Sequence, residues 1–99
     1  MRMLIQASID TELSNKLISE GGMEKAMEEM MGILKPEAAY FYPLHGRRGF
    51  TVVVDLADGA SLVPLVEPLW LRMGADVEIV PCMNADELSA GIAKIPGVG

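Results

Sequence analysis

The sequence predicts an α+β fold in which helices cover one face of a four-stranded antiparallel sheet. The clearest strand, Phe50 to Leu56, is β-branched and apolar, follows the glycine-punctuated segment 46–49 and stops at Asp58-Gly59. Apolar residues recur at helical spacing on both sides of it, and three other stretches have strand character. A central strand needs neighbours on both edges, and these stretches supply them.

The first strand and the start of the first helix are predicted by alternation and by a cap. Residues 3–9 alternate between apolar and mixed positions, which is typical of a strand with one buried face. Asp10 is a natural N-cap for the helix that follows. Gly21 and Gly22 then interrupt the helical pattern, and each costs roughly 1 kcal/mol relative to alanine inside a helix. We expect a kink or a break at this pair.

The helix recovers at Met23 and should end at Lys35, because a residue before proline is pushed out of the helical region. A methionine stripe of this kind is either core packing or an adaptable binding groove, and its helical spacing favours the core. The stripe contains Met23, Met27, Met30, Met31 and Leu34.

The second strand, Ala38 to Pro43, should pair antiparallel with Phe50 to Leu56. The linker 43–48 is longer than a two-residue turn, so we expect a wider turn containing glycine, with His45 near its tip.

The second half of the chain repeats the pattern of helix and strand. A helix follows Asp58-Gly59, is bent by Pro68 and ends at the C-cap Gly74. Ala75 to Pro81 gives the fourth strand. Asn84 caps a short helix from Ala85 to Lys94. A single domain of residues 1–95 is therefore expected to precede a flexible tail, 96–99.

The totals fit a small domain that leaves apolar surface for association. The chain has 99 residues, 51% of them hydrophobic, with eight methionines. Fourteen acidic against eight basic residues give a net charge of −6, which opposes binding to nucleic acid or anionic lipid. Cys82 is the only cysteine, and no segment has the pattern of a signal peptide or of a membrane span. We expect a cytoplasmic protein without a nucleic-acid or membrane partner.

The element order is that of the ferredoxin-like, or split βαβ, fold with one additional short helix. At this level the chain resembles the dimeric α+β barrel superfamily, and most closely a small bacterial family of uncharacterised function within it. The resemblance extends to about Lys94 and is carried by the GRRGF entry to the third strand, by Trp70, and by the segment VEIVPCMNADEL.

The resemblance implies a homodimer in which two protomers bring their bare sheet faces together. Better understood members of the superfamily include antibiotic biosynthesis monooxygenases, muconolactone isomerases, dye-decolourising peroxidases and chlorite dismutases, whose activities differ widely.

Strand parity supports the homodimer independently, because the face that the helices leave bare has a mixed composition. It is too apolar for water and too polar for a dry core, which suits a symmetric interface around a small cavity. The residues expected on this face are Leu4, Gln6, Ser8, Tyr40, Tyr42, Thr51, Val53, Asp55, Glu78, Val80 and Cys82.

Each candidate site residue on this face has a binding and a structural interpretation. Tyr40 and Tyr42 place phenols near the expected cavity with Thr51, where they either orient a substrate carbonyl or simply pack. Asp55 and Glu78 are the carboxylates best placed to act as a general base, unless they lie in water at strand ends.

The remaining candidates lie in the turn and on the second helix. Arg47 and Arg48 either clamp a carboxylate, or are solvated charges at the tip of the hairpin, or pair with an acid such as Asp55. His45 is the only imidazole, and its place beside two arginines in a turn favours a surface role. Trp70 is either a packing anchor or a surface on which flat ligands stack.

No set of residues converges on a catalytic or metal-binding pattern, so no cofactor and no metal are expected. We expect a homodimer that binds a small aromatic or polyketide-like molecule between its sheets, or that serves as a structural partner. The alternative is a cofactor-independent monooxygenase or isomerase that uses Tyr40 or Tyr42 together with Asp55 or Glu78.

Overall fold

One open antiparallel sheet organises the computed structural model, which describes residues 1–98. The strands are β1 (Arg2–Ser8), β2 (Ala38–Leu44), β3 (Arg47–Asp55) and β4 (Asp76–Pro81), in the order β2-β3-β1-β4. The helices are α1 (Thr11–Ser19), α2 (Met23–Leu34), α3 (Leu62–Met73) and α4 (Ala85–Ala93). The predicted α+β class and the four antiparallel strands are confirmed. Gly99 lies outside the described residues, and the flexible tail expected over 96–99 stays a prediction.

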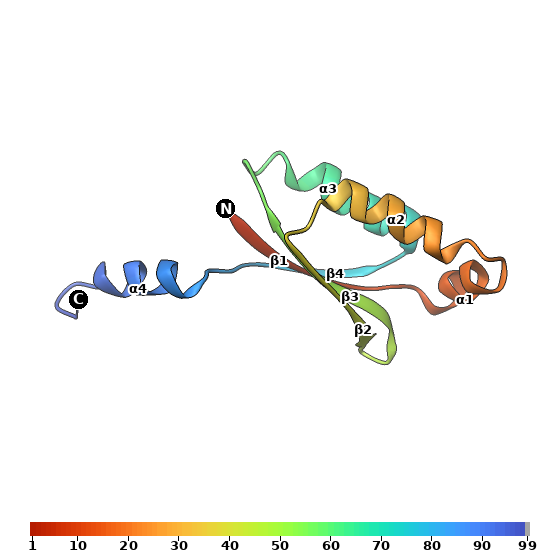
Figure 1. Ribbon diagram of the computed structural model, residues 1–99, viewed down its shortest axis with the longest axis horizontal. Helices are drawn as coiled ribbons and strands as arrows, with labels where there is room; N and C mark the ends of the chain where they lie inside the picture. Colours follow the sequence, from red (N-terminus) through yellow and green to blue (C-terminus); the bar gives the residue numbers. More distant parts are fainter. Residues whose placement is uncertain (99) are drawn as a thin grey trace.

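The helices lie on one face of the sheet only. Figure 1 shows α2 and α3 on the same side of the strands, with α1 beyond one end. The apolar side chains of β1 and β3 that point to these helices are buried, and along most of both strands they alternate with partly exposed residues on the other face. The core joins the sheet to α2 and α3 and includes Ile5, Ala7, Met30, Leu34, Phe50, Val52, Val54, Leu69 and Met73.

The predicted helix ends are confirmed. The Asp10 carboxylate accepts a hydrogen bond from the Leu13 amide at 2.9 Å, and α1 stops at Ser19, just before the glycine pair. Gly21 has a φ of +77°, a conformation that glycine adopts without the steric cost of a side chain. Gly74 ends α3 in the left-handed region, as expected.

The expectation of a wide turn between β2 and β3 is wrong. The strands pair through Pro43 with Arg48 and Leu44 with Arg47, so only His45 and Gly46 form the turn. Both have positive φ, +54° and +76°, as the tight type I′ hairpin requires. Pro43 does not end the strand because β2 is an edge strand, where a missing N–H removes no ladder hydrogen bond.

The last helix, α4, projects away from the rest of the chain (Figure 1). Asn84 caps it as predicted, in a reciprocal capping box with Glu87, yet every residue of α4 is exposed. The radius of gyration is 16.1 Å, compared with about 13 Å for a compact chain of this length. No helix within residues 1–98 is both long and apolar enough to span a bilayer.

Candidate functional site

The sheet face opposite α2 and α3 has no helix over it, and the register arranges its side chains in rows (Figure 1). Residues directly paired across neighbouring strands share a row, since their side chains point to the same side. One row is apolar and contains Ala38, Val53, Leu4 and Val80; the next is polar and contains Tyr40, Thr51, Gln6 and Glu78. We call these two rows, with Tyr42, the open face.

A hydrogen-bonded cluster occupies the middle of the open face. The hydroxyl of Tyr42 bonds the hydroxyl of Thr51, and Nε2 of Gln6 donates to the Tyr42 oxygen at 3.3 Å. The three residues come from β2, β3 and β1, so the cluster depends on the strand order. Tyr42 keeps 36% of its surface exposed and Tyr40 keeps 71%, which leaves both phenol rings accessible.

Arg47 lies at the hairpin end of this face and is already engaged. Its Nε donates to the Ser8 hydroxyl at 3.2 Å, and its guanidinium pairs with Asp76. The Ser8 hydroxyl in turn donates to the Leu44 carbonyl oxygen at 3.0 Å. Arg47 therefore ties the hairpin to β4 across the end of the sheet.

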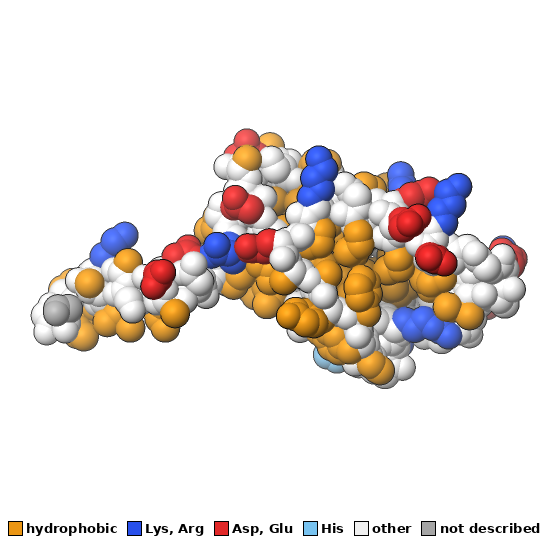
Figure 2. Space-filling model, in the orientation of Figure 1, with side chains coloured by type: hydrophobic (Ala, Val, Ile, Leu, Met, Phe, Trp, Pro, Cys, Tyr) orange, Lys and Arg blue, Asp and Glu red, His pale blue; other side chains and the backbone are white. Residues whose placement is uncertain are grey.

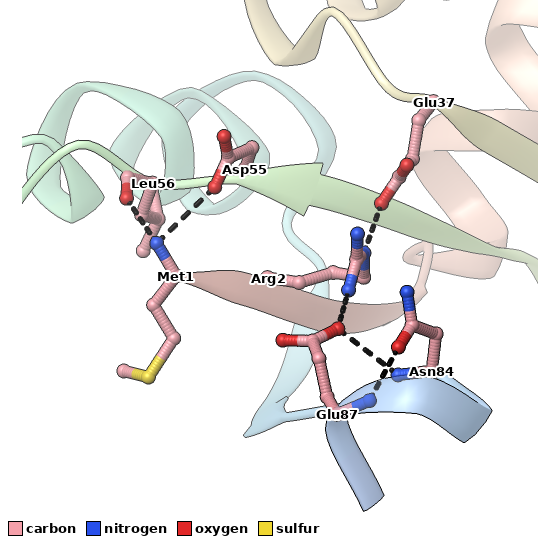
Figure 3. Close-up of polar contacts among 7 residues, drawn as sticks. All are labelled: Met1, Arg2, Glu37, Asp55, Leu56, Asn84 and Glu87. Carbon is pink, nitrogen blue, oxygen red and sulfur yellow. Dashed lines mark hydrogen bonds and ion pairs between the residues drawn. The ribbon is translucent and has the colours of Figure 1, made fainter. Parts of the chain in front are cut away.

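Asp55 lies at the opposite end of β3 from Arg47, so the alternative of an arginine pair with Asp55 is wrong. Its carboxylate accepts from the amino group of Met1 at 3.1 Å, and the same amino group donates to the Leu56 carbonyl oxygen at 2.6 Å (Figure 3). Asp55 is four positions along β3 from Thr51, about 13 Å on a strand. Asp55 is thus remote from the hydrogen-bonded cluster of Tyr42, Thr51 and Gln6, which we call the tyrosine cluster.

His45 and Trp70 also lie apart from the open face. His45 is exposed in the hairpin turn. Trp70 is on α3, in the layer on the other side of the sheet, where it lines a shallow hollow of about 130 Å³ with Val66 and Ile79. Of the eight predicted site residues, the structure brings together Tyr40, Tyr42, Thr51 and Glu78.

A second candidate surface, which the sequence did not reveal, lies on the helix side. It is a groove of about 620 Å³ between α1, α2 and the β2–β3 hairpin. Phe41, on its floor, is 57% exposed although it points toward the helix layer and lies 5.9 Å from Phe50, measured between ring centroids. Figure 2 shows hydrophobic side chains gathered between α2 and the hairpin. We call this surface the methionine groove, after Met23 and Met27 in its wall.

The methionine groove shows that the stripe of α2 serves two purposes. Met30 and Leu34 are buried in the core, as predicted, whereas Met23 and Met27 are only partly buried. Strand parity had directed Phe41 toward the helices. The signal that was missed is the polar character of α1 at this end, where Thr11 and Asn15 line the groove and Phe41 stays exposed.

Arg48 supplies a positive charge at the rim of the methionine groove. Its Nη1 donates to the Ser14 hydroxyl and to the Asn15 side-chain oxygen, both at 2.8 Å. Both acceptors are neutral, and within residues 1–98 no carboxylate lies within 4.0 Å of Arg48. A guanidinium held by neutral oxygens retains its capacity to attract an anionic group.

The residues with shifted pKa values are Arg2, Asp58 and Glu87, which lie outside both surfaces, and the carboxylate of Glu37 raises the pKa of Arg2. The hydroxyl and the amide of Ser61 hold the pKa of Asp58 below its ordinary value. The Asn84 amide, and then Arg2, lower the pKa of Glu87. No group of three or more histidine, cysteine or acidic residues within the described chain is arranged to hold a metal ion.

The sequence matches no model of a known protein family, and a search of curated proteins returned no similar chain. What these findings leave established is the fold itself: an α+β domain of order βααββαβα with one open antiparallel sheet.

Proposed function

We propose that the chain is a ferredoxin-like protomer of the dimeric α+β barrel type, whose homodimer encloses a small-molecule site between two open faces. If α1 and α2 count as one interrupted helix, the order up to β4 is βαββαβ. The strand order β2-β3-β1-β4 and the placement of α2 and α3 on one face support the same assignment (Figure 1).

The composition of the open face supports a partner rather than water. Val80 is 50% exposed, and it shares a row with Leu4 and Val53, which are only partly buried. Apolar rows of this kind are stabilised when a second sheet removes them from water. A second copy of the same face is the simplest such sheet, since a two-fold axis matches a surface with itself.

The tyrosine cluster is the single observation that carries the ligand proposal. Tyr42, Thr51 and Gln6 place hydrogen-bonding groups beside an apolar row. The exposed ring of Tyr40 lies two residues from Tyr42 on the same strand. Ligand sites commonly combine apolar walls with a few placed polar groups. A small aromatic or polyketide-like molecule with a hydroxyl or carbonyl group fits this combination.

The alternative is a cofactor-independent monooxygenase or isomerase, and one observation favours it. Glu78 pairs with Gln6 in the register and is therefore a carboxylate in the same row as the cluster. The bonding partners of Tyr42 among the described residues are neutral, however, so proton transfer through the phenol has no base in contact. Binding is thus the function that the geometry supports better.

Two measurements test the proposal. Size-exclusion chromatography with light scattering should give about twice the protomer mass of 10.7 kDa. Thermal-shift screening against aromatic acids and quinones should raise the melting temperature, because binding to the native state stabilises it by mass action. Tyr42→Phe should reduce that shift through loss of one hydroxyl, whereas Trp70→Phe, in the other layer, should leave it unchanged. A monomer at micromolar concentration, or a shift insensitive to Tyr42→Phe, contradicts the proposal.

A further inference from the structure

The helix α4 carries an apolar stripe that its own chain does not cover. Leu88 and Ile92 lie at i and i+4, which places them on one side of the helix, and Ile95 follows just after the helix ends. Each remains about half exposed, at 50%, 45% and 47%. Figure 2 shows hydrophobic side chains along the lower edge of α4, the side on which the sheet has no helices. An amphipathic helix with an empty apolar side is suited to docking.

Polar contacts at its first turn hold α4 away from the body. Arg2 of β1 donates to Glu37 at 2.6 Å and also pairs with Glu87 of α4 (Figure 3). The same Glu87 carboxylate accepts from the Asn84 amide at 3.1 Å. Arg2 therefore links the residue before β2 to the first turn of α4, and this link fixes the point at which α4 leaves the sheet.

The area of the chain indicates how large a partner surface is missing. Its solvent-accessible surface is 6432 Å², whereas a compact monomer of this mass exposes about 5,500 Å². The excess of about 900 Å² resembles the roughly 800 Å² that each partner contributes to a standard interface. The excess is therefore large enough to be covered by one interface of ordinary size.

We propose that α4 of one copy docks its apolar stripe into the methionine groove of a second copy, and that the exchange is reciprocal. The inference rests on the homodimer proposed above and adds a second contact to it. In Figure 1, α4 lies at one end of the long axis, and α1 and the hairpin that border the groove lie at the other. A reciprocal exchange that places each α4 on the partner's groove covers both surfaces in both copies.

The two surfaces are complementary in chemistry. Met23 and Met27 have unbranched side chains that adapt to an incoming helix, and Phe41 gives the groove an apolar floor. Arg48 adds a positive charge at the rim of the groove. The helix α4, which we call the arm, has two acids in its first turn, Asp86 and Glu87, and one base, Lys94, follows it. The helix α4 cannot reach the groove of its own chain, because the ion pair with Arg2 keeps its first turn at the other end of the molecule.

Cysteine cross-linking tests the position of the arm directly. In a Cys82→Ser background, which removes the only cysteine, Ile92→Cys and Met27→Cys are made separately, mixed and oxidised. We expect a disulfide-linked heterodimer of the two variants. Lys25→Cys is the matched control, because it lies on α2 two residues away and is exposed. Equal linking of Ile92→Cys to Lys25→Cys, or linking mainly between two Ile92→Cys arms, overturns the proposal.

Sedimentation measures the contribution of the arm to dimer affinity. Ile92→Asp should raise the dimer dissociation constant about tenfold or more, as loss of a central apolar anchor does. Ala90→Asp introduces the same residue on the polar side of the same helix and should change the constant little. Urea unfolding of the body should be equal in both variants, since α4 buries no residue.

The outcomes separate this inference from the proposed function. A dimer of unchanged affinity in Ile92→Asp overturns arm docking and leaves the sheet-to-sheet dimer in place. A wild-type monomer overturns both. Loss of ligand binding in Tyr42→Phe, with the arm cross-link retained, concerns the small-molecule site alone.

Discussion

The helices α2 and α4 have similar amphipathic patterns but differ in burial. Each carries apolar residues at helical spacing, with Met27, Met30 and Leu34 in α2, and Leu88 and Ile92 in α4. In α2 the second half of the stripe is buried against the sheet, whereas every residue of α4 is exposed. The difference shows that an apolar stripe predicts the need for a partner surface but does not say which surface, or which chain, provides it.

Different interactions hold the two regions. The body is held by a buried apolar core, and the arm by a capping box and the ion pairs of Arg2, which are exposed to solvent. Exposed ion pairs are screened by water and contribute far less than the burial of an apolar side chain. We therefore expect the arm to lose its helix in conditions where the body stays folded.

The largest expected effect comes from emptying the core of the body. Phe50→Ala should lower the free energy of unfolding by about 3–5 kcal/mol, because Phe50 is fully buried and its removal leaves a cavity. Urea denaturation measures it. In dilute solution, where the chain is monomeric, Ile92→Ala in the arm should change this energy by less than about 0.5 kcal/mol. Comparable losses in the two variants would mean that α4 belongs to the folded body after all.

A pair of glycine substitutions gives the next largest difference. An added Cβ at Gly49 would lie 2.7 Å from the Ala7 carbonyl oxygen and 2.8 Å from the Leu44 Cβ. Gly49→Ala should therefore cost about 1–3 kcal/mol of unfolding free energy, as overpacking does. At Gly91 in α4 an added Cβ meets nothing within 4 Å. Gly91→Ala should raise the helicity of the arm, since alanine is better than glycine by about 1 kcal/mol in a helix.

Circular dichroism and urea melts together measure both glycine variants. A neutral Gly49→Ala would contradict the expected difference in packing between body and arm, because it would mean that β1 and the hairpin can move to make room for a Cβ. The same difference is contradicted if Gly91→Ala shifts the urea midpoint of the whole chain.

The smallest expected effect is a pH dependence confined to the arm. The pKa of Glu87 is lowered in the folded state, first by the Asn84 amide and then by Arg2. Its stabilising contribution is present above the ordinary glutamate pKa and is lost as the pH falls through the lowered value. Carbon chemical shifts of residues 85–93 should report loss of helix in acid before the core responds. Glu87→Gln keeps a capping side chain without the charge and should remove this response; a response of the same size in that variant would assign it to another group.

Local signals in the sequence predicted the elements well. Asp10 and Asn84 cap their helices through their own side chains, and the glycine pair 21–22 interrupts the first helix, because these effects act within a few residues. Strand parity placed Tyr42 and Thr51 on the same face, where they bond. The tight hairpin was missed, since Pro43 is compatible with a strand only at a sheet edge and the sequence does not reveal which strand is at the edge.

The sites were less predictable than the elements, because they depend on distances between segments. Asp55 and Arg47 are on one strand, yet the register gives one to the amino group of Met1 and the other to Asp76. The methionine groove forms where Asn15 of α1, Met23 of α2 and Phe41 of β2 come together. Neither result follows from spacing along the chain.

The sequence by itself determined the class of fold, the helix ends and the alternation of each strand, because capping, glycine conformation and side-chain period are local properties. Only the tertiary structure decided that the tyrosine cluster forms, that a groove opens beside Met23 and Met27, and that α4 stands clear of the body. These features depend on strand register, on how α1 and α2 lie against the hairpin, and on the ion pair between Arg2 in β1 and Glu87 in α4. Each of them joins residues that are far apart in the sequence.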